Sequence, residues 1–139
     1  MSNALAFPYP IPEFGTEPYW EAANRRELRV QHCLDCGRLR WEPAPLCLDC
    51  QSQQHEWALL SGHGTVYSFT EITHPVHPAA FAKVPYIVVE VELAEQPNLR
   101  MISNLVDTPA SAVKIGAAVI VDFIAHPNGQ HLPVFRLRP

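Results

Sequence analysis

The four cysteines of this chain stand in two C-x2-C pairs, and this spacing constrains its fold more than any other feature. Cys33 and Cys36 form the first pair, Cys47 and Cys50 form the second, and ten residues lie between them. Two residues between thiolates let both sulfur atoms point into one tetrahedral site from a tight turn, for which Gly37 supplies the left-handed conformation. Two pairs provide four ligands, so the pattern predicts one structural zinc ion with no open coordination position.

Three other uses of the cysteines stay open: iron in a rubredoxin-like site, a pair of disulfides, and a redox-active C-x-x-C. The first residues have neither the basic nor the apolar segment of a secretory signal, and no apolar run approaches the roughly 18 residues of a membrane span. We therefore expect a cytoplasmic protein, whose thiols stay reduced and favour metal over disulfides. The redox use is the weakest alternative, because such a motif needs one pair on a βαβ unit.

Composition predicts a folded protein with short elements. Hydrophobic residues make up 47% of the 139 residues, which is enough for a packed core, and 14 prolines leave little room for long helices. The net charge is −4 and charged residues are 17% of the chain. This charge balance argues against a surface built for phosphate polymers.

The N-terminal part of the chain predicts an arm and one helix. Residues 1–15 are rich in proline and are expected to be extended. The segment Thr16–Leu28 is typical of a helix, with Thr16 as its N-cap and Pro18 in its first turn. Tyr19 and Ala23 would form its apolar side.

Five strands are predicted after the cysteines, over residues 64–72, 86–93, 99–106, 117–124 and 132–137. In the second of them, four apolar residues alternate with polar ones: Ile87, Val89, Val91 and Leu93 face one way. Pro97–Asn98 and Asn128–Gly129 mark hairpin turns. Five short strands favour a small closed barrel, because closure removes exposed sheet edges.

The chain resembles a family of acyl-CoA-associated proteins that join a rubredoxin-like zinc ribbon to an OB-fold. The resemblance runs from about Tyr19 to Phe135, and its order and spacing make it specific. The matching stretches are YWEAANRREL, CLDCGRLRWEPAPLCLDC, EWALLSGHGTVYSFTEI, VPYIVVEVEL, the Lys114-Ile115-Gly116 turn before AAVIVDFI, and LPVFRL. It implies a mostly β fold with an arm and helix in residues 1–29, a four-cysteine zinc ribbon in 30–57, and a five-stranded OB-fold barrel in 58–139.

The resemblance also implies a function. Members of the family are typically non-catalytic or accessory subunits that associate with thiolase-like synthases, acyltransferases, aldolases or hot-dog hydratases. Their OB-fold part is thought to contact the partner or the CoA thioester. We therefore expect an accessory subunit of an acyl-CoA-processing enzyme, assembled with copies of itself or with that enzyme, and in contact with acyl-CoA.

A cluster of arginines surrounds the first cysteine pair. Five of the ten basic residues lie within residues 25–40, where the acids are only Glu27 and Asp35. The four that we single out as contacts for CoA phosphates or for an acidic partner patch are Arg25, Arg29, Arg38 and Arg40. Arginine suits bidentate contacts with phosphate or carboxylate. The alternative is a solvated helix end favoured by the helix dipole.

Two further features allow other functions. His74 and His77, between the first two predicted strands, suit a rigid contact loop, an acid–base pair or metal ligands, although Pro75 and Pro78 make a helix there unfavourable. Trp41 flanks the predicted ribbon and is expected to pack it against the barrel, as is Trp57. A nucleic-acid-binding module is the main alternative function, since zinc ribbons and OB-folds both occur in such proteins, and a self-sufficient enzyme using the histidines ranks below it.

Overall fold

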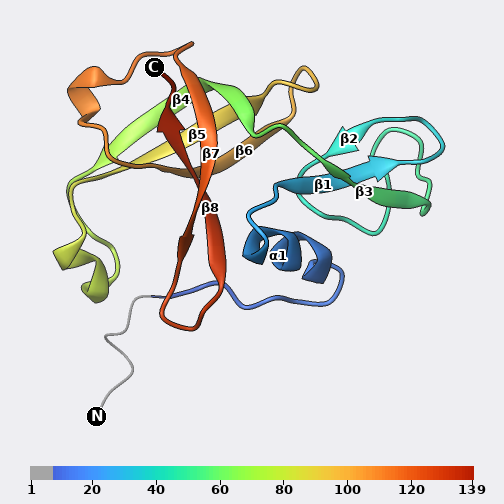
Figure 1. Ribbon diagram of the computed structural model, residues 1–139, viewed down its shortest axis with the longest axis horizontal. Coiled ribbons are helices and arrows are strands. Elements are labelled where there is room, and N and C mark those ends of the chain that lie inside the picture. The colour runs from blue at the N-terminus through green and yellow to red at the C-terminus, as the bar shows by residue number, and fades with distance from the viewer. Residues whose placement is uncertain (1–7) are drawn as a thin grey trace.

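The structure is a computed structural model that describes residues 8–139, so residues 1–7 of the predicted arm lie outside it. Helix α1 (Glu17–Asn24) precedes a three-stranded sheet of β1 (Arg29–Cys33), β2 (Leu39–Arg40) and β3 (His55–Leu59) in the order β2-β1-β3. Five strands follow: β4 (His63–Ile72), β5 (Tyr86–Leu93), β6 (Arg100–Leu105), β7 (Ala118–Ala125) and β8 (His131–Leu137). The small sheet and the five-stranded body lie side by side, with α1 at their junction (Figure 1).

Helix α1 begins where the sequence predicts but ends four residues early. Thr16 is the N-cap residue, yet its hydroxyl donates to the carbonyl oxygen of Glu13 rather than capping the helix. Arg26 has a φ of 62°, and the Arg26 backbone N–H still bonds to the carbonyl of Ala23. This left-handed residue ends the helix and turns the chain so that Leu28 enters the core. The prediction of helix over residues 25–28 is therefore wrong.

The five predicted strands are confirmed, and they close into a barrel in the order β4-β5-β6-β8-β7. Along β5, each of the four residues predicted to share a face is buried, while the residues between them are half-buried. The two predicted hairpins join β5 to β6 and β7 to β8, with Asn98 and Gly129 at positive φ in their turns. A parallel pairing of Leu105 with Phe135 and an antiparallel pairing of β4 with β7 complete the closure.

One hydrophobic core joins the barrel to the helix and the small sheet. Tyr19 of α1 and Val30 of β1 are buried in the same cluster as Val89 and Phe135 of the barrel. Trp41 packs against this cluster with its ring centroid 4.5 Å from that of Tyr19, which confirms the predicted packing of this tryptophan. The shared core fixes the orientation of the ribbon relative to the barrel.

Polar contacts reinforce the junction between α1 and the β7–β8 hairpin. The side-chain oxygen of Asn24 accepts hydrogen bonds from Gln130 Nε2 at 3.1 Å and from the His131 backbone N–H at 2.8 Å. Gln130 is buried and also donates to the carbonyl oxygen of Trp20. A buried amide needs such partners to offset its desolvation. Within residues 8–139, no helix has the length and apolar character needed to cross a bilayer.

Candidate functional site

The four cysteines converge on one point of the small sheet. All four Sγ atoms lie within 4.8 Å of one another, and the Cys33–Cys50 and Cys36–Cys47 pairs are each 3.6 Å apart. A regular tetrahedron with Zn–S bonds of about 2.3 Å has sulfur atoms about 3.8 Å apart, so the cluster fits zinc. No disulfide joins the four cysteines, so the disulfide alternative is wrong.

The two cysteine turns repeat the same backbone geometry. The Gly37 N–H donates to the carbonyl oxygen of Cys33 at 3.0 Å, and the Gln51 N–H donates to that of Cys47 at 2.8 Å. Gly37 has a φ of 81°, as predicted, and Gln51 takes the matching position with a φ of 65°. The sequence signal for this repeat is the tetrapeptide Cys-Leu-Asp-Cys, which occurs once in each turn.

One sulfur atom in each turn is prepared for a cation, because the pKa values of Cys33 and Cys47 are lowered while those of Cys36 and Cys50 are raised by burial and by the neighbouring sulfur atoms. A hydrogen bond from the backbone N–H of Cys36 is the main reason that the pKa of Cys33 falls to about 6. The backbone N–H of Cys50 likewise lowers the pKa of Cys47. Thiolates this close repel one another, so a divalent ion is needed to hold the four together. With all four positions taken by sulfur, the centre stabilises the ribbon and leaves no place for a substrate.

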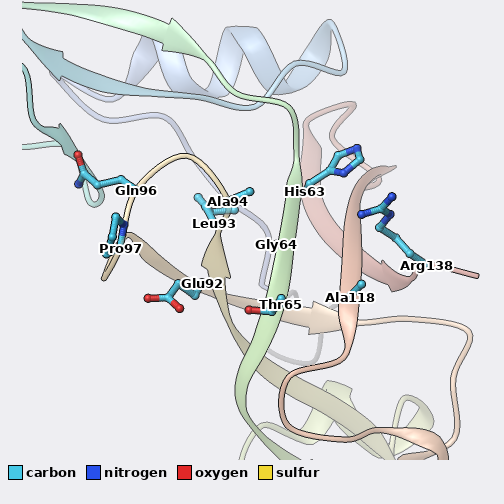
Figure 2. A pocket seen from close by; sticks show the side chains of 10 residues that line it. All are labelled: His63, Gly64, Thr65, Glu92, Leu93, Ala94, Gln96, Pro97, Ala118 and Arg138. Carbon is cyan, nitrogen blue, oxygen red and sulfur yellow. The ribbon is translucent and has the colours of Figure 1, made fainter.

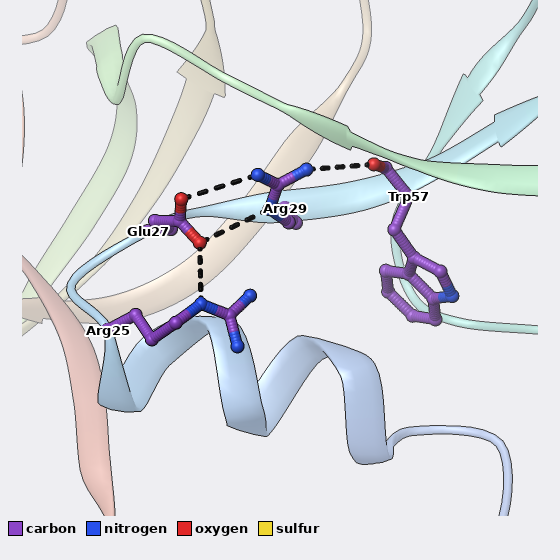
Figure 3. A network of polar contacts seen from close by, with 4 residues as sticks. All are labelled: Arg25, Glu27, Arg29 and Trp57. Atoms are coloured by element: carbon purple, nitrogen blue, oxygen red, sulfur yellow. Dashed lines mark hydrogen bonds and ion pairs between the residues drawn. The ribbon is translucent and has the colours of Figure 1, made fainter.

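Two of the four selected arginines share one carboxylate (Figure 3). Glu27 accepts from Arg25 Nε at 2.9 Å and pairs with Arg29 Nη2 at 3.3 Å. Arg29 Nη1 also donates to the carbonyl oxygen of Trp57 at 3.2 Å, which ties the start of β1 to β3. Arg29, and then Arg25, lower the pKa of Glu27 by hydrogen bonding. Both arginines therefore have internal partners.

The other two arginines lie in separate networks of the ribbon. Arg38 pairs with Asp49 of the second cysteine turn at 2.9 Å. Arg40 Nε donates to the side-chain oxygen of Gln31 at 2.7 Å, and Arg40 Nη2 donates to the carbonyl oxygen of Ala44 at 3.0 Å. The structure thus divides the four arginines among three separate networks. Their contact with CoA or with a partner stays a prediction.

The histidine loop contains a short 3-10 helix, η2 (Pro78–Ala82). His77 is its N-cap residue, and the Nδ1 atom of His77 accepts from the Ala79 N–H at 3.1 Å. His74 is exposed at the surface. The hydrogen bond to Ala79 gives His77 a structural use in shaping the loop.

A shallow opening of about 460 Å³ lies where β4 passes β5 and the end of the chain (Figure 2). His63 and Arg138 stand on one side of Gly64, and Glu92 stands on the other. A Cβ atom on Gly64 would lie 2.6 Å from the carbonyl oxygen of Glu92, so only glycine fits this crossing without a shift. The Glu92 carboxylate is engaged by the backbone N–H of Asn98 at 2.8 Å.

Two family sequence models match adjoining parts of the chain. The ChsH2 rubredoxin-like zinc ribbon domain matches residues 20–56, and the ChsH2 C-terminal OB-fold domain matches residues 57–123. A solved structure titled Ltp2-ChsH2(DUF35) aldolase is 36% identical, superposes with a TM-score of 0.83, and covers 93% of this chain and 98% of that chain. The chain belongs to the ChsH2 (DUF35) family. Membership identifies the four-cysteine cluster as the structural zinc centre of the family's ribbon.

Curated relatives of this ChsH2-family chain are subunits of larger enzymes. It is 38% identical over 118 residues to the probable enoyl-CoA hydratase alpha subunit of Thermomonospora curvata, covering 85% of this chain and 36% of that protein. It is 32% identical over 110 residues to the 3-oxo-4,17-pregnadiene-20-carboxyl-CoA hydratase alpha subunit of Mycobacterium tuberculosis, covering 79% of this chain and 34% of that protein. The chain thus spans about a third of the length of these two relatives.

Two more similarities extend the comparison. The benzoylsuccinyl-CoA thiolase subunit BbsA of Geobacter metallireducens is 35% identical over 95 residues, covering 68% of this chain and 56% of that protein. A DUF35-family structure of unknown function from Sulfolobus solfataricus is 16% identical with a TM-score of 0.61, covering 94% of this chain and 90% of that chain. At that identity the second similarity concerns the fold alone.

Proposed function

We propose that this chain is an accessory subunit of an acyl-CoA-processing enzyme, and that the partner supplies the catalytic residues. The observation that carries the proposal is the match to a chain of the solved Ltp2-ChsH2(DUF35) aldolase, 98% of which is covered at 36% identity. The named hydratase and thiolase relatives support the same role, because each is a subunit of an enzyme for a CoA thioester. The partner is accordingly a hydratase, a thiolase-like enzyme or an aldolase.

The zinc centre suits a subunit of this kind. Its four sulfur ligands hold the ribbon in shape, and the ribbon and barrel share a core, so the chain offers a rigid surface to another protein. Each cysteine turn carries one exposed leucine. Leu34 is 55% exposed and Leu48 is 90% exposed. Apolar side chains left in solvent at matching positions favour burial against a partner. We propose the cytoplasm as the compartment, in line with the metabolic relatives, and a hetero-oligomer as the working form.

Arg25, Arg29, Arg38 and Arg40 remain our proposed contacts for CoA phosphates or for an acidic patch of the partner. Arg25 and Arg38 are the more accessible, with side chains 57% and 50% exposed. Asp49, the acceptor of Arg38, is 57% exposed, and such an exposed pair is weak, whereas Glu27, the acceptor of Arg25, is 28% exposed and also binds Arg29. A phosphate or a carboxylate of the partner can therefore replace Asp49 as the acceptor of Arg38 at small cost.

The test is purification of the tagged chain from its native cell, followed by mass spectrometry of the proteins that remain bound at physiological salt. We expect a hydratase, thiolase-like or aldolase subunit in fixed stoichiometry. The double reversal Arg25→Glu and Arg38→Glu should reduce its recovery, whereas Arg138→Glu, at the far end of the chain, serves as the matched control. A folded, zinc-loaded chain that recovers no acyl-CoA enzyme would refute the accessory role.

A further inference from the structure

Exposure to solvent divides the four cysteines of the ribbon into two kinds. The first cysteine of each turn is buried: Cys33 is 0% exposed and Cys47 is 2% exposed. The second cysteine of each turn is exposed, which holds for both Cys36 and Cys50. The two turns therefore repeat more than their backbone geometry, because each presents one accessible cysteine and protects the other.

Two close sulfur contacts join these two kinds of cysteine across the turns. Cys33 Sγ lies 3.6 Å from Cys50 Sγ, and Cys36 Sγ lies 3.6 Å from Cys47 Sγ. Each contact thus pairs an exposed cysteine of one turn with a buried cysteine of the other turn. The sulfur atoms of a disulfide are about 2.05 Å apart, so a movement of about 1.5 Å brings either pair to bonding distance.

Two polar contacts span the same gap between the turns. Arg38 of the first turn pairs with Asp49 of the second at 2.9 Å, and the hydroxyl of Ser52 donates to the carboxylate of Asp35. Each contact lies at the surface and is individually weak. Together they favour the orientation in which the crosswise sulfur pairs face each other.

We propose that hydrogen peroxide converts the four-cysteine centre into two crosswise disulfides, Cys33–Cys50 and Cys36–Cys47. Coordination of zinc keeps all four sulfur atoms as thiolates, so exposure decides which of them peroxide reaches. The reactive cysteines are therefore Cys36 and Cys50. The buried cysteine of the opposite turn is the resolving partner of each, as a redox-sensing pair requires.

The reaction balances with one peroxide for each disulfide. The exposed thiolate attacks one peroxide oxygen, so that an S–O bond forms, the O–O bond breaks and hydroxide leaves. The buried thiolate then attacks the sulfur of this sulfenic acid, so that the S–S bond forms, the S–O bond breaks and a second hydroxide leaves. Two thiolates lose two electrons in total, and one peroxide gains them.

Oxidation of either pair removes two of the four sulfur ligands, and two ligands do not make a closed zinc site. The ribbon therefore exchanges its metal for covalent bonds between the same two turns. The nearby resolving thiolate also stops the exposed sulfur short of sulfinic acid, which is irreversible. Thiol reductants restore the four ligands, and transient disulfides of this kind are the redox-sensing ones in reducing compartments.

The test is treatment of the full-length, zinc-loaded chain with hydrogen peroxide, followed by mass spectrometric mapping of its disulfides. Trypsin together with a protease that cuts before aspartate places the four cysteines on four separate peptides. Asp35 and Asp49 lie within the two turns, and Arg38 and Arg40 lie between them. We expect only the two crosswise pairs of peptides. Disulfides within a turn, Cys33–Cys36 or Cys47–Cys50, would overturn the proposal.

Zinc release is measured in the same reaction with a chromogenic chelator. We expect release to rise in step with the crosswise disulfides, and zinc binding to return after treatment with dithiothreitol and added zinc. Retention of zinc in peroxide, or release that leads to sulfinic acid and does not reverse, would contradict the exchange. The reaction involves this chain alone, so its outcome is independent of the acyl-CoA partner.

Two matched variants identify the cysteine that peroxide attacks. Cys47→Ser leaves Cys36 exposed without its resolving thiolate, so dimedone, which labels sulfenic acids, should mark Cys36. Cys36→Ser leaves Cys47 buried, and its labelling by dimedone should be at least tenfold weaker. Equal labelling in the two variants would contradict the division into attacking and resolving cysteines. The disulfide map of the unsubstituted chain decides the pairing even if a variant fails to bind zinc.

Amide exchange tests whether the oxidised ribbon keeps its fold. Peptides from residues 30–57 should stay protected in the oxidised, zinc-free chain and lose protection in the reduced, zinc-free chain. Equal loss of protection in the two zinc-free forms would show that the disulfides do not replace the metal.

Discussion

The ribbon and the barrel of this chain reach a stable fold by different means. The hydrophobic core takes thirteen buried residues from positions 58–139 and only Val30 from positions 30–57. The ribbon compensates with four cysteines around one point, whereas the barrel closes its sheet and buries an apolar face. A segment with so little apolar burial cannot offset its chain entropy without a metal or another crosslink. In the ribbon, zinc therefore supplies the stability that apolar burial supplies in the barrel.

The largest effect of a single substitution should come from the centre of the barrel. Phe135 is fully buried, and Phe135→Ala is expected to lower the free energy of unfolding by about 3–5 kcal/mol through lost burial and a cavity. The measurement is the guanidinium midpoint followed by circular dichroism. Phe14→Ala is the matched control, since Phe14 is 99% exposed. Equal midpoints for the two variants would contradict the claim that the barrel depends on its core.

A smaller loss of unfolding free energy is expected where Gly64 of β4 pairs with β5. Gly64→Ala would set a Cβ atom 2.6 Å from both the Glu92 carbonyl oxygen and Val91 Cγ1, and the strands must separate to admit it. Overpacking of this kind costs about 1–3 kcal/mol. Thermal unfolding should show the loss in the barrel while zinc content stays complete. The control is Thr65→Ala at the next, exposed position. A drop in zinc content would mean that the zinc site depends on barrel packing and not on the four sulfur ligands alone.

A substitution at the junction between α1 and the β7–β8 hairpin should lower the free energy of unfolding by less. Asn24→Ala removes the acceptor of Gln130 and of the His131 N–H, and a buried amide left short of a partner costs about 1–2 kcal/mol. Amide exchange should rise in α1 and in the β7–β8 hairpin together. Glu21→Ala, exposed on the same helix, is the comparison variant. If exchange rises in α1 alone, the polar contacts do not couple the helix to the barrel.

The smallest effect is predicted inside the ribbon. Arg38 pairs with Asp49 across the two cysteine turns, but both side chains are at least half exposed. Such pairs contribute less than about 1 kcal/mol and are screened by salt. Arg38→Ala should therefore leave the rate of zinc release to a chelator nearly unchanged at 0.5 M salt. A large acceleration would show that the ion pair, and not the sulfur ligands alone, holds the turns together.

The sequence predicted the barrel and the zinc centre well because both depend on short-range patterns. Alternation of apolar residues located the five strands, and the C-x2-C spacing located the four ligands. It did not predict β1–β3, because these strands are short and carry little apolar alternation. The early end of α1 depends on the left-handed Arg26, a conformation that no residue type other than glycine signals clearly.

The sequence also missed the apolar groove over the outward side of β5 and β6, for a different reason. Its wall combines side chains such as Val88, Ile102 and Ile124, which come from three separate strands. Each looks like an ordinary outward residue in its own strand, and only barrel closure brings them together. The unpartnered His126 nitrogen likewise becomes visible only when its surroundings are known.

Hydrogen–deuterium exchange on the zinc-loaded and zinc-stripped chain, both under reducing conditions, tests the contrast between ribbon and barrel most directly. After zinc removal, peptides from residues 30–57 should lose their protection while peptides from β5 and β8 keep most of theirs. That result would show that the metal holds the ribbon and the apolar core holds the barrel. Equal loss of protection in both regions, or an unchanged ribbon, would contradict the account.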